Sequence, residues 1–73
     1  MQANALAIIT LRRETAARYE RVNRLWLLAC TAYRRLNQAP VQNLNALRNA
    51  AARLEQLSRG RAALMRDLKA LAD

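Results

Sequence analysis

The 73-residue chain is long enough for one domain at most, and Ala, Leu and Arg supply 16, 13 and 12 of its residues. It contains no His, one Cys and one Gly, and its 13 basic and five acidic residues give a net charge of +8. The composition excludes His-dependent nucleophilic catalysis, His-containing zinc sites, an intrachain disulfide and a Gly-rich phosphate loop. Five scattered carboxylates form no convincing acid/base pair, so we expect no enzyme activity, no cofactor and no metal.

The helix-forming composition is interrupted once, at Asn37-Gln38-Ala39-Pro40. Asn suits the end of a helix and Pro suits the first turn of the next one. We therefore predict an all-α fold in which residues 1–73 form a single antiparallel two-helix hairpin, with helices over about 3–37 and 40–72.

The first predicted helix carries a broad apolar stripe that includes the three aromatic residues. Tyr19, Trp26 and Tyr33 are spaced seven apart, so they follow one edge of that stripe. One interpretation makes them core residues of a bundle whose polar atoms reach the rim. The other makes them a partner-binding ridge, because Trp and Tyr are frequent at the energetic centres of interfaces.

Several large aliphatic residues of the same helix point away from the stripe. Ile9, Leu27 and Leu28 are candidates for a partner-binding patch, together with the three aromatics. Two arginine doublets, Arg12-Arg13 and Arg34-Arg35, lie near the helix ends and are candidates for electrostatic steering.

The second predicted helix has an apolar residue at alternating steps of three and four, and this pattern crosses Gly60 without a change of phase. One continuous helix, weakened at Gly60, is therefore expected. Arg61 occupies an apolar position of this pattern. It is either a side chain that reaches out to water or a specificity element, with Asp67 or Glu14 as candidate partners. Asn43 either caps this helix or specifies register.

The arginines divide into paired and unpaired sets. Glu14–Arg18, Glu20–Arg24 and Glu55–Arg59 have the i,i+4 order that favours ion pairing on a helix. The other arginines surround both helices and form no single stripe. A net charge of +8 is compatible with nucleic acid, but no known nucleic-acid-binding motif accompanies it.

The small size of the chain predicts association. Single cores of this size contribute little stability, and neither disulfides nor metals are expected to add to it, so we predict a homodimer or a stable partner. Cys30 is expected to be a small apolar core residue. No secretory signal or membrane span is predicted, so the expected location is the cytoplasm.

The favoured hypothesis is a small non-catalytic interaction module that inhibits, sequesters or chaperones another protein through the first helix. Its partner would present an apolar groove with an acidic rim. The size and composition are compatible with a regulator encoded by a phage or another mobile element. The alternative is a basic, dimeric, helical-bundle protein that binds RNA or DNA. Binding to a membrane surface is a weaker third option.

Overall fold

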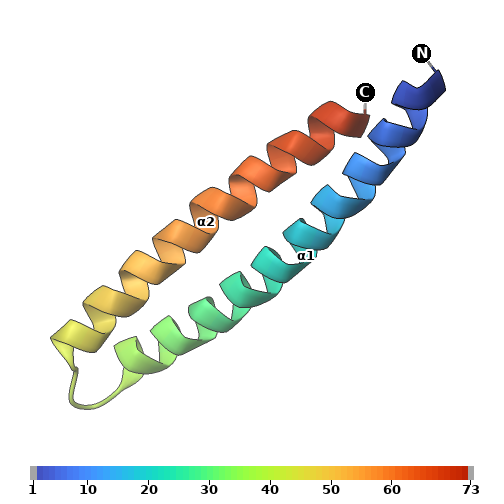
Figure 1. Cartoon of the computed structure of the whole chain (residues 1–73). Coiled ribbons are helices and arrows are strands. Elements are labelled where there is room, and N and C mark those ends of the chain that lie inside the picture. The colour runs from blue at the N-terminus through green and yellow to red at the C-terminus, as the bar shows by residue number, and fades with distance from the viewer. Residues whose placement is uncertain (1, 73) are drawn as a thin grey trace.

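The computed structural model describes residues 2–72, with side chains from residue 4 onward. Two helices, α1 (Gln2–Gln38) and α2 (Leu44–Ala72), lie side by side in opposite directions, as Figure 1 shows. The predicted antiparallel hairpin is confirmed. The predicted span of the first helix is close to that of α1, whereas the second helix starts later than expected.

The turn between the helices explains the late start of α2. We predicted that Pro40 would lie in the first turn of the second helix, and this is wrong, because residues 39–43 form the turn. Asn43 is the N-cap: its side-chain oxygen accepts a hydrogen bond of 3.1 Å from the backbone N–H of Ala46. The Gln42 side chain donates to the Asn37 carbonyl at 3.0 Å, which satisfies a backbone acceptor at the end of α1.

Helix α2 runs through Gly60 without a break, as the unchanged apolar phase predicts. The backbone at Gly60 has no positive φ, and a methyl group added there would meet no other atom within 4 Å. Nothing within the described chain therefore requires a glycine at this position.

The hairpin is a thin rod of 60 × 15 × 14 Å. Its radius of gyration is 16.9 Å, whereas a compact domain of this length would have about 11 Å. Because α1 is eight residues longer than α2, its N-terminal end projects beyond the end of α2 (Figure 1). Leu6 in this projecting part is 70% exposed.

The core of the rod is correspondingly small. Among the described residues, only Thr15 and Ala29 are buried, and no large side chain is fully buried. The Thr15 hydroxyl donates to the Leu11 carbonyl at 2.7 Å, so its burial leaves no unsatisfied polar atom. The apolar residues of α2 that follow the predicted pattern are all half-buried: Leu47, Ala50, Leu54, Leu57, Leu64, Leu68 and Leu71.

Neither helix, over residues 2–72, includes a segment with the length and apolar character that crossing a membrane requires.

Candidate protein-interaction site

The centre of the hairpin is held by a polar and aromatic contact that we call the Arg61 cluster: Tyr19, Asn23, Trp26, Ser58 and Arg61. The Arg61 guanidinium lies over the Trp26 ring at 4.5 Å from its centroid and over the Tyr19 ring at 5.7 Å. Its Nε donates to the Asn23 side-chain oxygen at 2.7 Å. The cation–π attraction and the hydrogen bond both join α2 to α1.

Trp26 completes this cluster. Its indole N–H donates to the Ser58 hydroxyl at 2.8 Å, so the polar end of the ring is satisfied within the hairpin. Trp26 and Tyr19 are half-buried between the helices, and Tyr33 is also half-buried. Two of the three predicted partner-binding aromatics thus have partners within this chain, and their role toward another protein stays a prediction.

Arg61 does not pair with either acid suggested by the sequence. In the structure its partners are the Asn23 amide oxygen and two aromatic rings, all on α1. A charged side chain at a half-buried core position forms good contacts in one relative position of the two helices, because a shifted register would leave it without them. This geometry favours the specificity role over simple exposure to water.

The predicted steering arginines differ in their surroundings. Arg12 donates from Nε to the Leu71 carbonyl, so it joins α1 to the C-terminal end of α2. A cation in this position also interacts favourably with the helix dipole. Arg13, Arg34 and Arg35 are exposed. Of the three predicted Glu–Arg pairs, Glu55–Arg59 forms at 3.1 Å. Among the described side chains, the other two pairs have no contact within 4 Å.

The exposed outer surface of α1 combines apolar and basic side chains with one acidic residue, Glu20. We define the outer face of α1 as Leu6, Ile9, Arg13, Glu20, Leu27 and Arg34. Ile9 and Leu27 are 18 residues apart, which is five helical turns, so they point in the same direction about 27 Å apart. Ile9 is 45% exposed and Leu27 51% exposed. Leu28 and Arg35 lie at the edge of this face, and Cys30 is half-buried beside it.

Comparison with known proteins finds no matching family model, no similar curated protein and no similar solved structure.

Two shallow grooves follow the line along which α1 and α2 meet. The groove near the turn is lined by Leu25, Leu28, Ala29, Ala32, Ala50 and Arg53. The groove near the chain ends is lined by Leu11, Thr15, Arg18, Asp67, Ala70 and Leu71.

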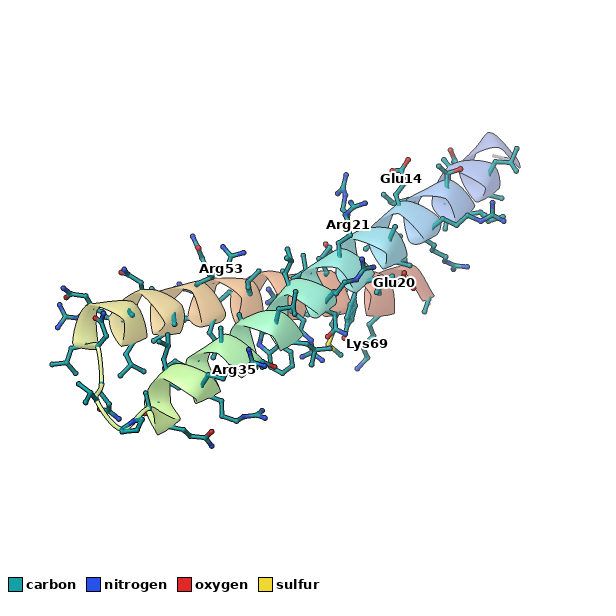
Figure 2. The ribbon with its side chains drawn as sticks, turned by 90° about the horizontal axis from the view of Figure 1, so that it is seen from below. Glu14, Glu20, Arg21, Arg35, Arg53 and Lys69 are labelled. Carbon is teal, nitrogen blue, oxygen red and sulfur yellow. The ribbon has the colours of Figure 1, made fainter. Side chains whose placement is uncertain are left out.

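These two grooves open on the same side of the hairpin. On α1, Leu11, Arg18, Leu25 and Ala32 follow each other at intervals of seven residues, and on α2 Arg53 and Asp67 are 14 residues apart. We call this side the groove face. In Figure 2, Arg53 and Arg21 project to one side of the hairpin while Lys69 points to the other.

Sequence reasoning missed Asn23, Ser58 and the role of Arg12 as a contact between helices. Asn23 and Ser58 are common surface residue types, and only the pairing of the two helices brings them to Arg61 and Trp26. The unusual position of Arg61 was the available signal, since it called for a partner across the hairpin. Within residues 2–72, no three His, Cys, Asp or Glu side chains gather in a way that could hold a metal ion.

Proposed function

We propose that this protein is a small non-catalytic interaction module that binds and modulates another protein through α1. The observation that supports the proposal is the exposure of large aliphatic side chains on the outer face of α1, where no other part of the described chain covers them. A row of exposed apolar residues bordered by arginines is typical of a surface that binds another protein.

The arrangement of the outer face supports a partner of a particular chemistry. Leu6 and Ile9 form one apolar patch, and Leu27 with Leu28 forms a second. Arg13 follows the first patch, and Arg34 and Arg35 follow the second, all exposed. We infer a partner with an elongated apolar groove and an acidic rim, in which the aliphatic residues are anchors and the arginines increase the association rate.

The proposed mode of action is binding alone. Binding along α1 would occlude or sequester the partner's groove, which suits an inhibitor, an adaptor or a chaperone. The proposal places this activity in the cytoplasm, where a single unpaired thiol is compatible with reducing conditions.

A photo-crosslinking experiment in the native host tests the proposal. A photoreactive amino acid is placed at Ile9 or Leu27, and the control is the same amino acid at Ala52, which is exposed on α2. We expect one host protein to be crosslinked from positions 9 and 27 and not from position 52. The purified partner should then bind Leu27→Asp at least about tenfold more weakly than wild type, whereas Ala52→Asp should bind normally.

Two results would contradict the proposal. One is crosslinking that is the same from α1 and from Ala52. The other is crosslinking to nucleic acid alone, supported by an affinity for RNA or DNA that falls steeply with salt and is lost when Arg12, Arg13, Arg34 and Arg35 are replaced by Ala. That second result would favour the nucleic-acid alternative.

A further inference from the structure

We propose that the groove face binds a second copy of this chain, forming an antiparallel four-helix dimer with a two-fold axis beside Gly60 and Leu25. The proposal is separate from partner binding through Ile9 and Leu27, because the groove face lies on another side of the rod and shares only the edge residue Leu28 with the outer face of α1. It is carried by surface area, by an unexplained glycine and by charge complementarity.

The hairpin exposes more surface than a folded monomer of its mass. One hairpin exposes 6043 Å², whereas a folded monomer of its 8.3 kDa mass would expose about 4,600 Å². The excess of roughly 1,400 Å² is more than the ~800 Å² that each partner buries in a standard interface. A second hairpin over the groove face would cover Leu25 and Leu28, which are 42% and 62% exposed.

Gly60 is a helical glycine without a structural reason inside the hairpin. An interior helical glycine costs about 1 kcal/mol relative to Ala, and here neither backbone conformation nor contact within the chain requires it. Gly60 lies midway between Arg53 and Asp67 along the groove face. A glycine at this midpoint lets the backbone of another helix approach closely, which accounts for a residue that the hairpin alone does not need.

The charges of α2 are complementary in such a contact. In an antiparallel α2–α2 contact centred on Gly60, each residue faces the one at the same distance on the other side of the centre. Arg53 and Asp67 are each seven residues from Gly60, so Arg53 of one copy faces Asp67 of the other, and the two-fold axis forms this pair twice. The twelve groove-lining residues carry a net charge of only +1 of the chain's +8, so two groove faces approach with little repulsion.

The register of the hairpin places α1 in the same contact. Asn23 and Trp26 pair with Arg61 and Ser58, so Gly60 lies level with the segment of α1 that contains Leu25. The two-fold axis beside Gly60 therefore brings the Leu25 side chains of both copies together. An apolar contact at the axis with two ion pairs beside it is a self-complementary interface.

Analytical ultracentrifugation of the full chain over a range of concentrations tests the proposal, with charge-reversal variants. We expect a species of twice the chain mass for wild type. Asp67→Arg should dimerise at least about tenfold more weakly than wild type. Combining it with Arg53→Asp should restore the dimer affinity to within a few-fold of the wild-type value. Helical circular dichroism of each variant separates lost association from lost folding. A wild type that is monomeric at all concentrations overturns the proposal, as does a dimer whose affinity does not change on charge reversal.

Disulfide trapping tests the position of the axis. In a Cys30→Ala background, Leu25→Cys should form an intermolecular disulfide rapidly on mild oxidation. The matched control is Leu27→Cys, which has similar exposure but lies on the outer face of α1. Equal trapping at both positions, or trapping at Leu27 alone, would show that another face joins the copies. Loss of partner crosslinking with intact dimerisation would contradict the proposed function only.

Gly60→Leu provides an independent test because Leu favours helix more than Gly does. We expect the helical content of the monomer to stay the same or rise, while dimer affinity falls at least about tenfold. An unchanged dimer affinity would contradict a close approach at Gly60.

Discussion

The centre of the hairpin and its N-terminal projection are both helical but differ in what surrounds them. In the Arg61 cluster, side chains of both helices satisfy one another through two hydrogen bonds and two cation–π contacts. In the projection, Leu6 is 70% exposed and Ile8 and Ile9 are each more than 40% exposed. The difference teaches that polar contacts can fix how two helices pair without burying much apolar surface. The polar groups at the centre are satisfied within one hairpin, whereas the apolar side chains of the projection stay exposed in it.

The largest expected effect comes from the aromatic ring at the centre. Trp26→Ala removes the ring beneath the Arg61 guanidinium and the hydrogen bond to Ser58. We expect a loss of about 2–3 kcal/mol in the free energy of unfolding, measured by chemical denaturation followed by circular dichroism. The matched change in the projection, Leu6→Ala, should stay within about 0.5 kcal/mol of wild type in a single hairpin. Equal losses at both sites would contradict the contrast between centre and projection.

Substitution of Arg61 should have the second largest effect on the free energy of unfolding. Whether the hairpin becomes less or more stable depends on the replacement. Arg61→Ala removes both cation–π contacts and leaves Asn23 without its donor, so we expect a loss of about 1–2 kcal/mol. Arg61→Leu restores an apolar residue to the pattern of α2 and should be neutral or stabilising.

A register assay then separates stability from specificity in Arg61→Leu. We expect this variant to populate more than one helix pairing, visible as additional amide peaks in NMR spectra. A single set of peaks identical in number to wild type would show that Arg61 does not select the register.

The smallest effect concerns the two arginines of the first doublet. Arg12 donates to the Leu71 carbonyl at the end of α2, whereas Arg13 lies exposed on the outer face of α1. Arg12→Ala should therefore lower the free energy of unfolding by about 0.5–1 kcal/mol, and less at high salt. Arg13→Ala should have almost no effect on stability, as expected of an exposed surface residue. Thermal melts of both variants at two salt concentrations compare them directly, and equal effects would contradict the capping role of Arg12.

Several features of the fold followed from the sequence because they depend on local chemistry. The helix-forming composition and the break near Pro40 predicted the hairpin, and the unchanged apolar phase predicted one helix through Gly60. The first residue of α2 was harder to predict, since both Pro40 and Asn43 suit the beginning of a helix. Helix α2 begins after Asn43 because the Asn43 side chain accepts a hydrogen bond from the Ala46 N–H, and residues 39–43 reverse the chain direction.

The candidate site was less predictable because its contacts join distant residues. The sequence marked Trp26 and Arg61 as unusual but not as partners, and it indicated nothing about Asn23 or Ser58. Residues 32 to 38 positions apart meet only after the hairpin has formed in one register, and a polar residue is assigned a partner only then.

The sequence by itself determined two long helices, their apolar sides and a strong positive charge, because helix propensity and periodicity act over short distances. Tertiary structure decided which arginines are structural and which side chains stay exposed. Arg12 and Arg61 became contacts between helices, whereas Arg13, Arg34 and Arg35 remained on the surface. The physical reason is that two helices cover only one side of each other, so burial and pairing depend on which sides meet.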